Sequence, residues 1–162
     1  GADERRVAGA DINRGFGRRW QQGRVTPHRG GTGLDPLTRQ VASDRGVVVL
    51  FGGMVQGVGY FNDTWEFDGS QWRYVATGGP PERGSVDMVY DSERRVTVLF
   101  GGYDGAMRFG DTWEWDGSEW RLINVASPTA RDGHRMTFDS LRGATYLFGG
   151  YDVGFKNDLW KR

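Results

Sequence analysis

The stretch that decides the fold is LFGG at residues 99–102, followed after a short loop by DTWEWDGSEW at residues 111–120. Both phrases occur again in the chain, in full or in part: LFGG at 50–53 and 147–150, DTWEFDGSQW at 63–72, and NDLW at 157–160. The three LFGG copies start at residues 50, 99 and 147, so they are spaced by 49 and 48 residues. Self-similarity at a fixed period of this size indicates a protein built from repeated structural units.

Each repeat is predicted to form four short β-strands joined by tight turns. Runs of β-branched and aromatic residues alternate with turn residues, and the aspartate-glycine pair before the last strand is a strong hairpin signal. The predicted strands, in chain order after the first, are 47–51, 64–67, 72–76, 86–90, 96–100, 112–115, 120–125, 134–138 and 144–148. The first strand of the first repeat stays open, because a turn fits at 41–46 and also, in another frame, at 34–41.

These motifs together resemble the kelch repeat, in the form found in bacterial kelch proteins. The glycine pair that closes an apolar strand, the tryptophan in the third strand and the tryptophan that opens the fourth carry the resemblance over residues 37–160. The resemblance implies an all-β fold, a partial β-propeller of three four-stranded blades at 37–77, 83–126 and 131–162, the third incomplete. Kelch propellers usually have six or seven blades and mostly bind other proteins or sugars.

The chain is too short for a closed ring of this kind. Six or seven blades require roughly 290–340 residues at the kelch period, whereas the chain has 162. It is therefore expected to be a fragment whose remaining blades belong to a longer chain; the alternatives are a ring completed by a second copy and an open array. Residues 1–36, rich in arginine and glycine, are predicted to be a disordered arm or a decayed blade remnant, since residues 11–20 repeat the spacing of 63–72.

Composition supports the all-β class and excludes several functions. The 27 glycines and 14% aromatic residues suit many tight turns between short strands. Lysine plus arginine and aspartate plus glutamate both number 21, so a neutral chain argues against nucleic-acid binding. The longest apolar run, 47–51, is too short to insert into a membrane, and the compartment stays open.

The sequence shows no pattern typical of a catalytic or cofactor site. The segment contains no cysteine, which excludes thiolate metal sites and cysteine nucleophiles from it. It also excludes the copper radical centre of some kelch-type oxidases, which the resemblance would allow, because that centre depends on a cysteine-modified tyrosine. His28 and His134 have no second ligand at metal spacing. We therefore expect no cofactor, no metal and no enzyme activity in this segment. The alternative is a piece of a kelch-type sugar-modifying enzyme, epimerase-like or oxidase-like, whose active site lies partly in other blades.

Recognition is predicted at the end of the strands where the loops vary. Antiparallel order puts loops 54–62, 103–110 and 151–157 on one face, together with 77–85 and 126–133, and variable loops on a rigid scaffold commonly carry binding sites. The candidate ligand-binding residues are Tyr60, Arg83, Tyr103, Asp104, Arg108, Arg131, His134, Tyr151, Asp152 and Lys156. Tyrosine and arginine favour interface hot spots. A structural alternative is open for the repeat-equivalent pairs: ion pairs between blades for Arg83 and Arg131, and loop anchoring for the two Tyr-Asp pairs.

Overall fold

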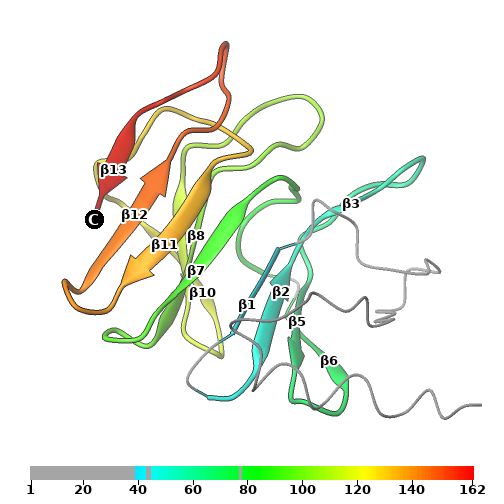
Figure 1. The fold of residues 1–162 in the computed structure, drawn as a ribbon. Coiled ribbons are helices and arrows are strands. Elements are labelled where there is room, and N and C mark those ends of the chain that lie inside the picture. Colours follow the sequence, from blue (N-terminus) through cyan, green and yellow to red (C-terminus); the bar gives the residue numbers. More distant parts are fainter. Residues whose placement is uncertain (1–38, 43–44, 77) are drawn as a thin grey trace, which may run out of the picture.

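A computed structural model describes residues 39–42, 45–76 and 78–162 of the chain. Within these ranges the structure is all-β, without helices, and its antiparallel sheets do not close into a barrel (Figure 1). The predictions for residues 1–36 lie outside the described residues. Residues 39–42 are described for their backbone pairing only.

Two four-stranded sheets and one three-stranded sheet follow each other along the chain. The first has the order β1-β2-β5-β6, the second β7-β8-β9-β10, and the third β11-β12-β13. Their strands are β1 (Arg39–Ala42), β2 (Val48–Phe51), β5 (Thr64–Phe67), β6 (Trp72–Ala76), β7 (Asp87–Asp91), β8 (Val96–Phe100), β9 (Thr112–Trp115), β10 (Trp120–Ile123), β11 (Arg135–Asp139), β12 (Ala144–Phe148) and β13 (Leu159–Lys161). Each repeat thus builds one sheet.

The predicted strands agree with the structure, with small shifts at their ends. Strands β7 and β11 begin one residue later than expected, after the positive backbone φ angles at Ser85 (53°) and Gly133 (66°). The fourth strand of the second sheet ends at Ile123 instead of residue 125. Strand β1 pairs with β2 in the register Arg39↔Phe51 to Ala42↔Val48, so the frame with its turn at 41–46 is the better prediction.

One hairpin was not predicted from the sequence. Strands β3 (Met54–Val55) and β4 (Gly59–Tyr60) pair within the loop between β2 and β5. Gly57 and Gly59 take φ angles of 81° and 131°, which glycine adopts without steric cost, so the loop can double back on itself. The hairpin extends this loop beyond the end of the sheet (Figure 1).

The aspartates predicted for turns do hold the turns. At each aspartate-glycine turn one carboxylate oxygen accepts two backbone N–H groups, Asp68 from Ser70 (2.8 Å) and Gln71 (2.9 Å). Asp116 does the same in the second sheet, with N–H donors at 2.8 and 3.0 Å. These hydrogen bonds hold the pKa of Asp68 down at about 2, the Ser70 hydroxyl contributing most. Because the carboxylates serve the backbone, the turn geometry is encoded locally.

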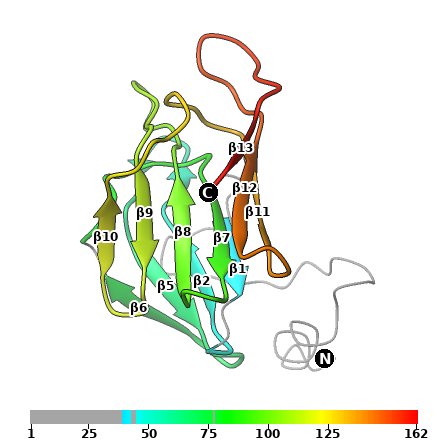
Figure 2. The same cartoon turned by 90° about the vertical axis from the view of Figure 1, so that its left-hand side faces the viewer.

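The core lies between the first and second sheets. Val49, Phe51, Leu99, Trp115 and Trp120 are buried there and pack in one cluster. Both faces of β2 are covered, because Val49, Leu50 and Phe51 in succession are all buried. Strand β7 contacts both β1 and β11, so the first strands of all three sheets lie together (Figure 2).

Candidate functional site

Three loops project from the same end of the strands and touch one another. They connect β2 to β5, β8 to β9 and β12 to β13, and they lie in the upper half of Figure 1. These loops begin after the repeated glycine pairs. Gly101 and Gly102 have φ angles of 64° and 107°, and a Cβ on Gly102 would lie 2.5 Å from the side chain of Val86. The glycine pair therefore lets each loop leave the sheet against its neighbour.

A continuous line of aromatic and cationic contacts crosses the three loops. The rings of Tyr60 and Tyr103 meet edge to face with centroids 6.2 Å apart. The Arg108 guanidinium lies 5.1 Å from the Tyr103 ring centroid and 4.7 Å from that of Tyr151. Tyr151 in turn packs edge to face with Phe155 at 5.3 Å. We call this set, Tyr60-Tyr103-Arg108-Tyr151-Phe155, the aromatic line.

Arg108 is held at the centre of the aromatic line. Its Nε donates a hydrogen bond to the Asp132 carboxylate at 2.5 Å, and that bond raises the pKa of Arg108. Asp132 lies in the loop between β10 and β11, and its backbone N–H and carbonyl pair with Tyr151 at 3.1 and 2.9 Å. The Arg108 side chain stays 30% exposed, so it is oriented by protein groups yet reachable by a ligand.

The two Tyr-Asp pairs anchor their loops. Asp104 accepts the N–H groups of Ala106 (2.8 Å) and Met107 (2.7 Å), and these bonds lower its pKa. The Tyr103 hydroxyl donates to the carbonyl of Gly105 at 2.6 Å. This geometry fits the loop-anchoring alternative for Asp104. The Tyr103 ring nevertheless remains part of the aromatic line.

Asp152 and Lys156 stabilise the third loop. The Lys156 ammonium lies 2.9 Å from the Asp152 carboxylate, and this contact is the main reason that the pKa of Asp152 falls to about 2. Asp152 also accepts the Thr129 hydroxyl (3.1 Å) and the Gly154 N–H (3.2 Å). Both charged groups are therefore engaged within the loop region, beside the aromatic line.

Sequence analysis missed the apolar tips of these loops. Phe155 is 91% exposed and Val153 is 95% exposed, and both sit on the third loop. Val58 and Met107 are exposed on the other two loops. The signal was present, since each of these three loops carries an apolar residue among polar ones. Large apolar side chains left in water near one another favour an interaction surface.

Arg83 is buried and links two sheets. Its side chain is 0% exposed, and its guanidinium grips both oxygens of Asp111 at 2.5 and 3.0 Å and also donates to the carbonyl of Gly101 (3.1 Å). Its backbone pairs instead with the first sheet's loop, with Gly53 and Phe61 at 3.0 Å. One residue thus bonds to the first sheet's loop through its main chain and to the second sheet through its side chain.

Arg131 repeats this arrangement between the second and third sheets. Its guanidinium binds Asp158 at 2.6 and 3.0 Å and the carbonyl of Gly149 at 2.9 Å. Its backbone pairs with Gly102 (2.9 Å) and Phe109 (3.0 Å). The Arg131 guanidinium holds the pKa of Asp158 well below its usual range. We call Arg83 and Arg131 the bridging arginines. Both have a structural role, but each ion pair joins two residues of one repeat, and the bonds to the preceding sheet's loop are made by the main chain.

His134 also lies below the loop surface. It is buried, and its ring meets that of Phe100 edge to face at 5.3 Å. A Cβ on Gly150 would lie 3.0 Å from the Cβ of His134, so the third glycine pair packs directly against it. The structure therefore brings Tyr60, Tyr103, Arg108 and Tyr151 together at the surface. It places His134 and the bridging arginines in the interior.

Comparisons with known proteins add no assignment for this site. The sequence matches no protein-family model and none of the curated proteins with which it was compared. Within residues 39–42, 45–76 and 78–162, no three histidine or acidic side chains come together as metal ligands. No helix in the same ranges is long and apolar enough to cross a membrane.

Proposed function

We propose that this chain is part of a kelch-type β-propeller that serves as a non-catalytic binding scaffold. The three sheets share one strand order, and their first strands lie together, as strands around a propeller axis do. The bridging arginines fasten each sheet to the loop of the preceding one. Further blades of a longer chain, or a second copy, would complete the ring.

Recognition occurs at the aromatic line. The observation that carries this proposal is the unbroken contact series from Tyr60 to Phe155 across three loops. Aromatic rings and arginine supply large, well-oriented contact area at low entropic cost, as hot spots require. The exposed Phe155 and Val153 beside the line favour a protein partner, while the tyrosine rings also suit a sugar face.

The test starts from ligands selected on the intact chain. Glycan arrays and displayed peptide libraries are screened, and the selected ligands are titrated against Arg108→Glu and Phe155→Ser. Each substitution should weaken binding at least tenfold, because it removes one side chain of the aromatic line while leaving the buried interior unchanged. Arg142→Glu is the matched control, since Arg142 is an exposed arginine paired with Asp139 in a turn at the other end of the strands.

Two results would contradict the proposal. Selected ligands that bind Arg108→Glu and Phe155→Ser as tightly as the parent chain would place recognition elsewhere. Ligands weakened equally by Arg142→Glu would show a general charge effect instead of a site. Charge reversal at Arg131 is unsuitable for this test, because that residue is buried against Asp158 and its loss would damage the fold.

A further inference from the structure

One position of the repeat carries a different side chain in each of the three variable loops. In each loop the residue that follows this position donates its backbone N–H to the second glycine of the glycine pair, at 2.9 to 3.0 Å. The position itself holds Tyr60, Arg108 and Phe155, all three of them members of the aromatic line. Because the backbone bonds repeat while the side chain changes, the fold does not dictate which residue stands there, and the position can serve recognition.

A second repeat position changes together with Arg108. Gly84 and Asp132 are equivalent, since each pairs its backbone with the tyrosine of the loop that follows, Tyr103 and Tyr151. Asp132 accepts the Nε–H of Arg108 at 2.5 Å. The acidic side chain is thus present where the preceding loop carries an arginine, and glycine stands where the preceding loop carries a tyrosine. Arginine and aspartate therefore form one unit, which we call the Arg108–Asp132 pair.

The Arg108–Asp132 pair keeps hydrogen-bonding groups in reserve. Among the residues that the structure describes, the Nη groups of Arg108 donate no hydrogen bond and Oδ2 of Asp132 accepts none. The bridging arginine Arg83 differs, since its Nε and both Nη groups are bonded and its side chain is 0% exposed. The side chains of Arg108 and Asp132 are 30% and 20% exposed. The pair therefore offers N–H donors and an acceptor oxygen on a partly exposed surface.

The charges around the pair decide which ligands it favours. Arg108 and Asp132 neutralise each other, as Lys156 and Asp152 do on the neighbouring loop. Asp104 adds a negative charge, held by N–H groups of its own loop. A ligand carboxylate bound to the Nη groups would lie near the Asp132 carboxylate, and such a like-charge contact is costly. An acidic ligand is therefore disfavoured, and a cationic ligand meets an aspartate that is already paired.

Hydroxyl groups match both halves of the pair. A hydroxyl donates one hydrogen bond and accepts others, whereas a carboxylate only accepts and an ammonium only donates. Of two hydroxyls on neighbouring carbons, one can accept from an Nη group of Arg108 while the other donates to Oδ2 of Asp132, so that no polar group is left unpaired. The Tyr151 ring, 36% exposed and 4.7 Å from the guanidinium, offers apolar surface to the C–H groups of the same ligand.

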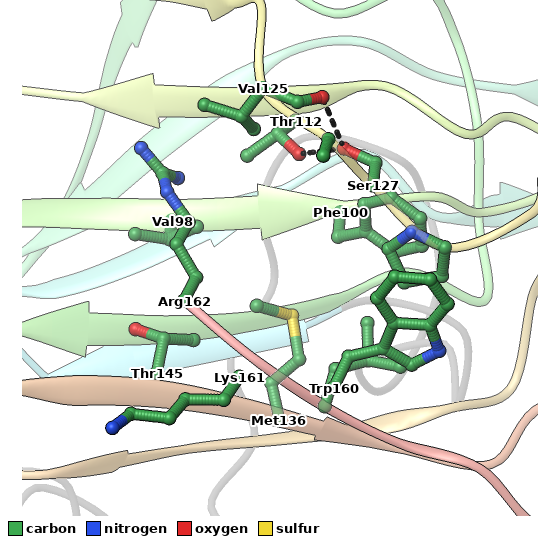
Figure 3. A pocket seen from close by; sticks show the side chains of 13 residues that line it. Val98, Phe100, Thr112, Val125, Ser127, Met136, Thr145, Trp160, Lys161 and Arg162 are labelled. Carbon is green, nitrogen blue, oxygen red and sulfur yellow. Dashed lines mark hydrogen bonds between the residues drawn. The ribbon is translucent and has the colours of Figure 1, made fainter.

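The pocket between the second and third sheets suits such a ligand less well. Its walls are mostly apolar, with Phe100 on β8 and Leu147 on β12 among them (Figure 3). The Ser127 hydroxyl in this pocket already donates to the carbonyl of Val125 at 3.1 Å and lies 3.3 Å from the Thr112 hydroxyl (Figure 3). Because hydroxyl groups buried against apolar walls lose their hydrogen bonds to water, the Arg108–Asp132 pair is the better site.

We propose that the Arg108–Asp132 pair binds two neighbouring hydroxyl groups of an uncharged sugar. The inference rests on the proposed function of the aromatic line, and it narrows the ligand at this position to a neutral carbohydrate. Arg108 supplies the donors and Asp132 the acceptor. Asp132 also disfavours sugars that carry a carboxylate, so it is the residue that sets the specificity of the site.

The test compares neutral sugars with their acidic counterparts. The full 162-residue chain is screened against oligosaccharides of glucose, galactose and mannose and against the matching oligosaccharides of their uronic acids. Sugars that bind are titrated by calorimetry. We expect a neutral oligosaccharide to bind more tightly than the matching acid, by about fivefold or more, because only the acid places a carboxylate beside Asp132.

The substitution Asp132→Asn gives the decisive comparison. It keeps an oxygen for the Nε–H of Arg108 but removes the negative charge, so the preference should reverse in favour of the acidic oligosaccharide. Asp104→Asn is the matched control, because it removes a charge from the same group of loops while Asp104 bonds to Ala106 and Met107. It should leave the preference unchanged. Melting temperatures close to that of the parent chain show that both variants are folded.

A second variant tests the donors independently of charge. Arg108→Lys keeps the positive charge but loses the planar pair of Nη groups. It should weaken binding of the neutral oligosaccharide by about fivefold or more, without creating a preference for the acidic one.

The outcomes separate this inference from the proposed function. The sugar assignment is overturned if neutral and acidic oligosaccharides bind equally well, if Asp132→Asn leaves the preference as it was, or if Asp104→Asn shifts it as far. If the chain binds only peptides and Arg108→Glu weakens them, the proposed function stands and the sugar assignment is wrong. If neither sugars nor peptides bind, or if all of them bind Arg108→Glu as tightly as the parent chain, both proposals fail.

Discussion

Replacing Arg83 with alanine should destabilise the chain strongly, although Arg83 makes no surface contact. Breaking a buried ion pair by removing one partner costs about 3–5 kcal/mol. Asp111 retains 25% exposure, which puts this cost at about the lower end, near 3 kcal/mol. The Gly101 carbonyl also loses its charged donor, adding about 1 kcal/mol. Arg83→Ala should therefore lower the free energy of unfolding by about 4 kcal/mol.

Urea unfolding followed by tryptophan fluorescence measures this loss, and a double-mutant cycle assigns it. With Asp111→Asn already in place, Arg83→Ala should cost far less, because the charge it would strand is gone. Arg142→Ala breaks an exposed ion pair with Asp139 and should stay close to the parent stability. The reasoning is refuted if Arg83→Ala costs less than about 1 kcal/mol, or costs the same in both backgrounds.

The remaining predictions concern pH, packing and the loop tips. Burial opposes ionisation of Asp111, but the hydrogen bonds from Arg83 and Trp113 outweigh it, so the pKa of Asp111 is lowered in the folded protein. The contribution of ionised Asp111 to the free energy of unfolding should therefore be complete above about pH 4 and be lost as the pH falls below it. In urea titrations, the free energy of unfolding should fall less between pH 7 and pH 3 for Asp111→Asn than for the parent chain. Trp120→Ala should cost about 3–5 kcal/mol by calorimetry, because it leaves a cavity where the indole packs against Phe51 and Trp115. Gly79→Ala should lower the melting temperature for two reasons: the added Cβ would collide with the Trp120 ring, and the backbone φ of Gly79 is 121°, which alanine adopts only with strain. Phe155→Ser should leave the melting temperature unchanged.

The strands and turns were predictable because their signals are local. The LFGG phrase and the aspartate-glycine turn each act within a few residues, and the structure reproduces the strands they indicated. The register of β1 was harder, because two turn frames fitted the sequence. Only pairing with β2, a contact between separate segments, decides between them.

The candidate site was predictable in part. Placing the variable loops on one face brought Tyr60, Tyr103, Arg108 and Tyr151 into one set, and the structure joins these residues by direct contact. Arg83 and Arg131 looked the same as Arg108 in the sequence, because residue type does not reveal which arginines face a carboxylate in the interior. That distinction depends on Asp111 and Asp158, which lie more than 25 residues away in the chain.

The bridging arginines bear on how such a chain grows. Each arginine precedes the sheet that its guanidinium grips, and its main chain belongs to the loop layer of the sheet before it. A duplicated segment of one repeat length therefore brings its own arginine and aspartate, and it can form the same contacts with the sheet before it. Tandem duplication can thus change the number of sheets while these arginine contacts between neighbouring sheets are kept.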